Sequence, residues 1–322
     1  MKVINKALLI TGLSIILFGC AKKEYKKDKN TLYFGLYPKT LVNDESLIET
    51  LNKKISIPSS SNLNGWNDYN YYIETNITSY MYYIDIDNNN DNIYDYRGVY
   101  FNQYRPNNTM ANSNIDRSYQ DDNNYFIDNI YWFKYEKIKW EILENKNDSY
   151  LIVTKDIIDS QDYYSDATSG VTEHNGGSGY GNNYKLSNIR KWLNDSFYNW
   201  AFNDKEKEII LTTEVDNSKE STSWMNNDYA CENTFDNIFL LSHHEAIDIY
   251  YPVQENRKYK GTDYAKCQGL LVASNGYSCW RLRSPYTNFE TRDTHLDHNG
   301  QRFNQGVINT GYGIRPALWI KK

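Results

Sequence analysis

Apolar and polar residues alternate along the last part of the chain in a way that predicts antiparallel strands. Residues 280–283 read Trp, Arg, Leu, Arg, and this period of two is typical of a strand. The dipeptide Asn299-Gly300 favours φ > 0 and predicts a two-residue hairpin turn. Residues 313–320 are apolar on nearly both faces, so we expect them to form a central strand that completes the sheet.

The rest of the chain carries further strand patterns and a few short helical ones. The strand patterns cover residues 31–40, 71–86, 95–101, 130–140 and 141–153. Helices are indicated by a starting or capping residue followed by apolar residues, at Ser187, Asn203/Glu206 and Ser242/Glu245. A further helix of one or two turns is expected over residues 262–268, ended by Gly269. Short helices scattered among strands indicate an α+β domain rather than alternating βαβ units.

Residues 1–19 have the pattern of a signal peptide rather than of a membrane-spanning helix. Two lysines precede the short apolar run Ala7–Phe18, and the segment closes with Leu17-Phe18-Gly19-Cys20. This ending resembles the bacterial lipobox, which implies cleavage before Cys20 and diacylglycerol on its sulfur. An ordinary secreted protein with a chance cysteine is the alternative.

The chain that follows is predicted to be one anchored domain. Residues 20–30 have no apolar face and predict a lipidated, solvated tether. Residues 31–322 contain no Pro/Ser-rich linker, so we expect a single domain, held outside the cytoplasm at the cell membrane. The formal net charge is -6, and loss of the signal peptide makes the chain more acidic still. This charge argues against nucleic acid as a partner.

Residue types that commonly carry catalysis occur without the partners that they need. Adjacent side chains of a helix diverge by about 100°, so His243 and His244 cannot chelate one ion together. His295 and His298 flank the predicted hairpin turn, and we expect all four histidines to be exposed. Ser284 and the cysteines have no recognisable neighbouring base. We therefore expect no catalytic residue and no cofactor.

One acidic stretch resembles a calcium loop only in part. Oxygen-bearing side chains recur at alternate residues, as in a calcium loop, at Asp85, Asp87, Asn89 and Asp91. Asn90 stands where such a loop has its glycine, and Tyr96 stands where it has its final glutamate. A solvated acidic turn is the favoured interpretation, and calcium binding is the alternative.

Two arginines lie in strand patterns that are otherwise rich in Trp, Leu and Ile, namely Arg283 and Arg315. A buried guanidinium must pair with carboxylates or carbonyls. We therefore favour structural pairing for both side chains. The alternative for Arg283 is recognition of a ligand.

Eight segments, in a fixed order, carry a resemblance to a known family. They are FGLYPKT (Phe34–Thr40), YWFKYEKIKWEIL (Tyr131–Leu143), IIDSQDYY (Ile157–Tyr164), IRKWLNDSFYNWAF (Ile189–Phe202), TFDNIFLLSHHEA (Thr234–Ala246), TDYAKCQG (Thr262–Gly269), WRLRSP (Trp280–Pro285) and GIRPALWI (Gly313–Ile320). The chain resembles the bacterial domain of unknown function numbered 6273, common in surface and secreted proteins of Firmicutes and their relatives. Arg281, where a second tryptophan is usual, and Cys279 depart from the family pattern.

The resemblance has implications for the fold. Shorter members pass from the FGxYP segment almost directly to the next strand, so residues 41–130 look like an insertion between two neighbouring strands. The closing pattern is similar to that of C-type-lectin-like domains, which implies that Ala317–Ile320 pairs with Tyr33–Tyr37. The resemblance also implies a disulfide between Cys231 and Cys267, with Cys279 buried and reduced.

Two classes of function remain: a non-catalytic binding or adhesion module, and an extracytoplasmic enzyme with an unrecognised active site. We favour the first, because no residue set for known chemistry is complete. The expected ligand is a glycan or a protein, bound by loops rich in Gly, Asn, Ser and Tyr at residues 166–181, 218–227 and 286–292. The candidate binding residues are Tyr180, Tyr184, Trp224, Tyr286 and Arg283, and ordinary packing is the alternative for the aromatic ones.

Overall fold

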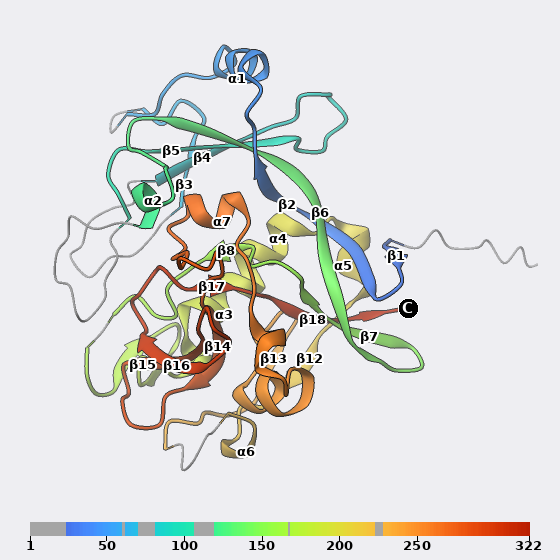
Figure 1. The fold of residues 1–322 in the computed structure, drawn as a ribbon, viewed down its shortest axis with the longest axis vertical. Coiled ribbons are helices and arrows are strands. Elements are labelled where there is room, and N and C mark those ends of the chain that lie inside the picture. Colours follow the sequence, from blue (N-terminus) through green and yellow to red (C-terminus); the bar gives the residue numbers. More distant parts are fainter. Residues whose placement is uncertain (1–23, 60–61, 70–80, 106–118, 167, 223–227) are drawn as a thin grey trace, which may run out of the picture.

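Two large β-sheets, two small ones and a set of short helices make up the fold (Figure 1). The computed structural model describes residues 24–59, 62–69, 81–105, 119–166, 168–222 and 228–322. The architecture is mixed α and β with mostly antiparallel strands, as the sequence pattern predicts. Within these ranges, no helix is both long and apolar enough to cross a membrane.

The main sheet has nine strands, and its path runs β11-β18-β7-β6-β5-β4-β3, with β2 and β1 joined through β6. The members are β1 (Lys26–Asp28), β2 (Thr31–Leu41), β3 (Asn67–Asp68), β4 (Met81–Ile86), β5 (Tyr96–Phe101), β6 (Ile130–Asn145), β7 (Ser149–Thr154), β11 (Ile210–Leu211) and β18 (Ala317–Lys321). The smaller sheet has the order β16-β15-β14-β17-β8. It contains β8 (Asp159–Ser160), β14 (Trp280–Pro285), β15 (Arg292–Leu296), β16 (Arg302–Gly306) and β17 (Gly313–Ile314).

The long strand β6 organises the main sheet. It pairs with β5 through residues 130–134, with β2 through residues 133–141 and with β7 through residues 140–145. The strands at the two ends of residues 41–130, β2 and β6, are therefore direct neighbours. The residues between them add α1 (Glu45–Asn52), β3, β4, β5 and α2 (Tyr119–Asp122), and β5 extends the sheet beyond β6 (Figure 1).

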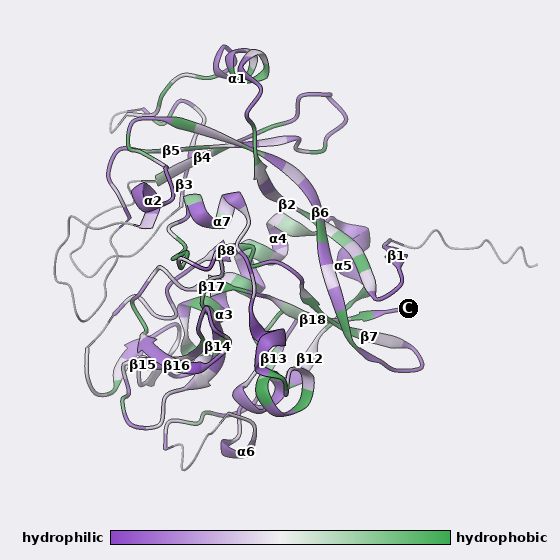
Figure 2. Cartoon of the chain, viewed as in Figure 1, coloured by the Kyte–Doolittle hydropathy of each residue, from purple (hydrophilic) through white to green (hydrophobic). Residues whose placement is uncertain are grey.

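The expected pairing of the first and last strands is wrong. Ala317 of β18 pairs with Val153 of β7, whereas β2 pairs with β6. The two terminal strands lie in one sheet but are separated by β7 and β6. The short turn between β6 and β7, whose tip is hydrophilic in Figure 2, brings β7 beside β6 at a low entropic cost of loop closure. The last strand then adds to β7.

The hairpin β15–β16 forms as predicted, but with a three-residue loop instead of a two-residue turn. The Gly300 N–H donates to the Asp297 carbonyl at 2.8 Å, and the Asp297 N–H donates to the Gln301 carbonyl at 2.8 Å. Gly300 has φ +76°, which is typical of a type I turn followed by a left-handed residue. A Cβ atom at this position would lie 2.3 Å from the Gln254 carbonyl oxygen, so only glycine fits.

The helices are short, and the capping residues that the sequence indicates do cap them. Ser187 accepts the Arg190 N–H, and the capping boxes Asn203/Glu206 and Ser242/Glu245 both form. Thr262 also acts as a cap and accepts the Ala265 N–H. The helices are η1 (Tyr184–Leu186), α3 (Asn188–Trp192), η2 (Leu193–Phe197), α4 (Tyr198–Ala201), α5 (Asp204–Ile209), α6 (Lys219–Thr222), η3 (Glu245–Tyr250), η4 (Gln254–Arg257) and α7 (Asp263–Cys267). The small sheets are β9 (Thr172–His174) with β10 (Gly177–Gly179), and β12 (Thr213–Val215) with β13 (Thr234–Asp236).

Both arginines predicted to pair inside the structure do so. Arg283 is fully buried; its Nη2 donates to Glu245 Oε1 and to the Asp216 carbonyl, each at 2.8 Å, and its Nη1 donates to the Leu240 carbonyl at 2.8 Å. Arg315 is also fully buried, donates to the Thr154 carbonyl, and lies 3.2 Å from the centre of the Tyr259 ring. Both guanidinium groups therefore have structural roles.

The Arg283–Glu245 pair predicts a large stability effect. Replacement Glu245→Gln leaves the buried guanidinium without its counter-charge, so we expect the free energy of unfolding to fall by about 2–4 kcal/mol. The matched control Glu255→Gln removes an exposed partner of Lys258 and should cost less than about 1 kcal/mol. Denaturant unfolding measures both, and equal small losses would show that the buried pair has no special role.

Two of the four histidines expected to be exposed are buried. His243 is 4 % exposed and His295 is 1 % exposed. The backbone N–H of His243 donates a hydrogen bond to Ser284 of β14, and His295 lies within β15, where its ring packs against Tyr312. Burial lowers the pKa of His243 to about 4 and also lowers that of His295. The neutral imidazole is therefore the form that the folded chain keeps.

This burial gives a pH dependence of stability with a defined sign. Below its ordinary pKa of 6.5, the unfolded chain gains a proton on residue 243 that the folded chain does not take up until about pH 4. Stability should therefore be lost as the pH falls from 6.5, by about 1–2 kcal/mol at about pH 5. In the His243→Gln variant, the decrease in the free energy of unfolding that residue 243 causes between about pH 6.5 and 4 should be absent. An identical pH profile of the unfolding free energy in both chains would contradict the assignment.

Candidate functional site

A cleft of about 680 Å³ lies between the residue 41–130 region and the helical segment 188–201. Its lining is rich in aromatic rings, with polar and charged groups among them. The lining residues are Asp68, Tyr69, Tyr83, Gln161, Asp162, Tyr164, Ser165, His174, Asn175, Asn188, Lys191, Trp192, Asp195, Ser196 and Trp200. We call this feature the aromatic cleft. The lining comes from β3, β4, β9 and the segment from α3 to α4; β3, β4, α3 and α4 are labelled in Figure 1.

One wall is the helical segment that Ser187 begins. Its apolar stripe, Ile189, Leu193 and Phe197, is fully buried, because residues at this spacing share one helix face. Trp192 and Trp200 lie at the edges of that stripe and are only partly buried, so they border the cleft. The middle turn, η2, has π-helical hydrogen bonding, a local distortion that occurs frequently at functional sites.

A second part of the lining consists of the tyrosines Tyr69 and Tyr83, which lie next to the buried Arg97. The ring centres of Tyr69 and Tyr83 are 4.7 Å apart, and those of Tyr83 and Trp200 are 5.4 Å apart. The guanidinium of Arg97 lies 4.2 Å from the Tyr83 ring centre and 4.7 Å from that of Trp200. Arg97 is fully buried and donates two 2.8 Å hydrogen bonds to Asp85. The rings are thus fixed by cation–π contacts as well as by packing.

Asp162 provides a carboxyl group that is largely shielded from water in the cleft. Its side chain is 12 % exposed, and Arg105 Nη2 lies 3.8 Å from its Oδ1. Burial raises the pKa of Asp162, and the charges of Arg105 and Arg281 oppose that rise. A carboxyl group with a raised pKa in a cleft is a common feature of functional sites.

The remaining polar groups form a hydrogen-bonding rim. Asp195 is paired with Lys191 at 2.9 Å, and the Asn175 side chain donates to Asn188 Oδ1 at 2.9 Å. The His174 ring packs 4.1 Å from the centre of the Tyr164 ring, and burial lowers its pKa. Ring faces next to amide and carboxylate groups suit a ligand that is apolar on its faces and polar at its edges.

Of the binding residues expected from the sequence, Tyr180, Tyr184, Tyr286 and Arg283 do not line this cleft. Tyr184 is 1 % exposed in the core, and Arg283 is occupied by its ion pair. Trp224 lies outside the residues that the structure describes. Tyr180 and Tyr286 are partly exposed on neighbouring loops.

Glu290 joins those loops. Its carboxylate accepts hydrogen bonds from the Gly170 N–H at 2.8 Å and from the Tyr229 hydroxyl at 3.3 Å. Tyr180 packs against Tyr229 with ring centres 5.1 Å apart, and Tyr286 lies parallel to the Phe289 ring. Parts of the expected binding loops therefore do meet, but they form a surface with rings packed on one another and not a lined cleft.

The acidic stretch does not form a calcium-type ligand set. Asp85 binds Arg97, and Asp87 accepts the Asp91 and Asn92 N–H groups. The side chain of Asn89 donates to Asp95 at 2.8 Å. These groups stabilise the turn of their own hairpin. Among the described residues, no group of three or more His, Cys, Asp or Glu side chains could hold a metal ion.

The disulfide implied for Cys231 and Cys267 does not form. Both are free thiols, as is Cys279. The reason is their placement: Cys267 ends α7 within the core near Asp159, whereas Cys231 lies beside the backbone of Tyr184 and Lys185. Cys267 and Cys279 are buried, and burial raises the pKa of both thiols, which makes them poor nucleophiles.

The sequence pattern does not indicate the aromatic cleft. Trp192 and Trp200 belong to the apolar helical pattern that follows Ser187, and Tyr83 belongs to the strand pattern of residues 71–86. One local signal was present, since Lys191 and Asp195 interrupt the apolar pattern next to the tryptophans. The contact between Tyr83 and Trp200 depends on the position of β4 relative to α4. Short-range sequence patterns do not specify that position.

The fold and site define a mixed α/β, mainly antiparallel domain with an aromatic cleft at the edge of a helical segment. The chain belongs to the family described as Domain of unknown function (DUF6273), whose model matches residues 147–322. No curated protein and no solved structure matches the chain. The match includes the helical wall and Asp162, whereas Tyr69 and Tyr83 precede it.

Proposed function

We propose that the chain is a lipid-anchored surface protein that binds a saccharide in the aromatic cleft. The observation that carries this proposal is the lining of the cleft, where Trp192, Trp200 and Tyr83 occur beside Asp162 and Asn188. Sugar rings have apolar C–H faces that pack on aromatic rings, and their hydroxyl groups bind carboxylates and amides. The volume of about 680 Å³ is in the usual range for a small-molecule site.

A glycan array tests the proposal. The protein to use is the chain from residue 20 onward with Cys20→Ser, which keeps every described residue. We expect it to bind one class of glycans on the array. Trp200→Ala and Tyr83→Ala should each weaken the affinity about 3- to 10-fold, which is the usual contribution of one aromatic contact. Trp319→Ala is the matched control, because Trp319 is a partly buried ring that contacts Lys146 outside the cleft.

The control and the array together decide the outcome. Equal losses in Trp200→Ala and Trp319→Ala would contradict binding in the cleft. If the chain binds no glycan on the array, the saccharide proposal is wrong, and a protein remains as the expected ligand.

Saccharide hydrolysis is the second candidate function, and Asp162 is the observation that favours it. A carboxyl group with a raised pKa can act as a general acid on a glycosidic oxygen. Release of new reducing ends from a retained glycan, abolished in Asp162→Asn while binding persists, would identify an enzyme. Binding without release would identify a binding module.

The anchor is part of the proposal and has its own test. Cys20 lies outside the described residues, and β1 begins at Lys26. We expect mass spectrometry of the membrane fraction to find a mature chain that starts at Cys20 and carries diacylglycerol on its sulfur. Cys20→Ala should prevent this processing. A mature chain that begins at another residue would contradict the anchor.

We also propose that the domain is related to the C-type-lectin-like folds. Support comes from the order of its closing elements, in which β14 is followed by the β15–β16 hairpin, then β17, and finally β18 in the sheet that contains β2. An experimental structure that superposes on such a domain over both sheets is the test.

A further inference from the structure

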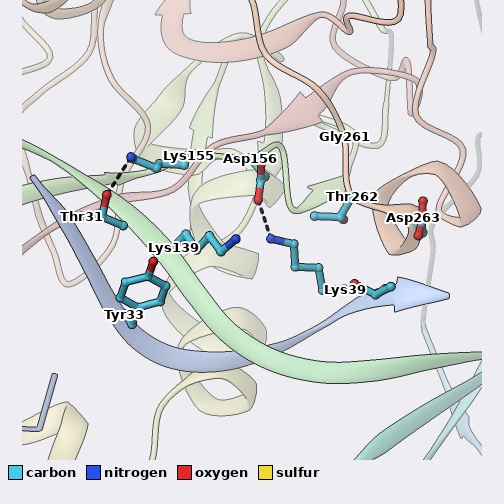
Figure 3. Close-up of a pocket in the computed structure, with 10 residues that line it drawn as sticks. Thr31, Tyr33, Lys39, Lys139, Lys155, Asp156, Gly261, Thr262 and Asp263 are labelled. Atoms are coloured by element: carbon cyan, nitrogen blue, oxygen red, sulfur yellow. Dashed lines mark hydrogen bonds and ion pairs between the residues drawn. The ribbon is translucent and has the colours of Figure 1, made fainter. Parts of the chain in front are cut away.

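A second groove, of about 550 Å³, lies beside β2, β6 and the start of α7 (Figure 3). Its residues come from β2, from β6, from the segment after β7 and from the segment that enters α7. They are Thr31, Tyr33, Lys39, Thr40, Lys139, Lys155, Asp156, Gly261, Thr262 and Asp263. We call this feature the lysine groove. It shares no lining residue with the aromatic cleft.

The three lysines of the groove are only partly neutralised. Lys39 is paired with Asp156 at 2.6 Å, and the other carboxylate, Asp263, accepts from Lys266 and from the Leu41 N–H. Lys155 donates to the neutral Thr31 hydroxyl at 2.7 Å. The described residues give the Lys139 ammonium group no hydrogen bond or ion pair. Figure 3 shows the Lys39 and Lys139 side chains extending toward the same open space.

We propose that the lysine groove binds a phosphate group. Like charges that converge on one groove favour an anion between them. Ammonium groups bind phosphate as point charges, and the hydroxyl groups of Thr31, Thr40 and Tyr33 in the lining supply neutral hydrogen-bond donors. The chain as a whole carries a formal charge of -6, so this local excess of cations is not a consequence of a generally basic surface.

The position of the groove indicates where the phosphate comes from. β1 folds back on β2, so that Lys26 pairs with Tyr33 and Asp28 pairs with Thr31, and both partners line the groove. Lys26 follows Cys20 by six residues, which span at most about 20 Å. If Cys20 is lipidated as proposed above, the groove lies close to the membrane surface. The headgroup phosphate of an anionic lipid is then the nearest source.

Vesicle binding tests the inference. The protein used is the chain from residue 20 onward with Cys20→Ser. We expect it to sediment with phosphatidylcholine vesicles that contain phosphatidylglycerol and not with phosphatidylcholine alone. The double variant Lys139→Gln/Lys155→Gln should lower the partition coefficient about 20- to 30-fold, at about fivefold for each lysine. Lys139→Arg/Lys155→Arg keeps both charges and should restore binding.

The charge-matched control is Lys53→Gln/Lys54→Gln, at the end of α1, with both side chains exposed. It should bind the vesicles as the unmodified chain does. Equal weakening in the control would show a response to net charge alone and would overturn the site. Unchanged thermal unfolding of the Gln variants would exclude misfolding as the cause.

Inorganic phosphate distinguishes a lipid headgroup from a soluble phosphate compound as the ligand. The chain is titrated with phosphate, and chloride at the same ionic strength is the control. If the chain binds vesicles, and if both free phosphate and the Lys139→Gln/Lys155→Gln variant weaken that binding, the ligand is a lipid headgroup. Binding of free phosphate without vesicle binding supports a phosphate site that serves a soluble ligand. Binding of neither overturns the inference, and none of these results depends on whether the aromatic cleft binds a saccharide.

Discussion

The burial of two arginines on β14 is the constraint that ties several distant segments to the smaller sheet. Residues 280–283 of β14, which alternate between apolar side chains and arginines, are all fully buried. This strand therefore has no exposed face. A guanidinium inside a protein must find acceptors for its donors. Arg283 finds them on Glu245, Asp216, Ser221 and Leu240, and these segments are thereby tied to one strand.

The same kind of interaction supports two parts of the lining of the aromatic cleft. Arg281 donates to the Gln161 carbonyl and pairs with Asp293, which fixes the backbone next to Asp162. Arg97, held by Asp85, lies behind Tyr83 and Trp200. The cleft is therefore lined by side chains whose supports are charged, directional and buried. Such supports limit the freedom of the rings before any ligand arrives, which lowers the entropic cost of binding.

What the sequence predicts well is local. The capping residues Ser187, Asn203 and Ser242 act within four residues of themselves, and the need of Arg283 and Arg315 for partners follows from their apolar neighbours. The pairing of β18 with β7, the burial of His243 and the free thiols depend on contacts between distant segments. Tyr184 shows the limit: its Gly- and Asn-rich surroundings read as a loop, yet η1 directs the ring into the core.

The short helix α7 is the physical link between the two proposed sites. Asp263, at its first turn, lines the lysine groove and accepts from Lys266 and the Leu41 N–H. The next residue, Tyr264, is buried, and its hydroxyl lies 2.8 Å from that of Tyr69 in the aromatic cleft and accepts from Arg97. Adjacent residues of a helix point in directions about 100° apart, so one turn serves both sites. The two sites therefore share a structural support, α7, although they share no lining residue.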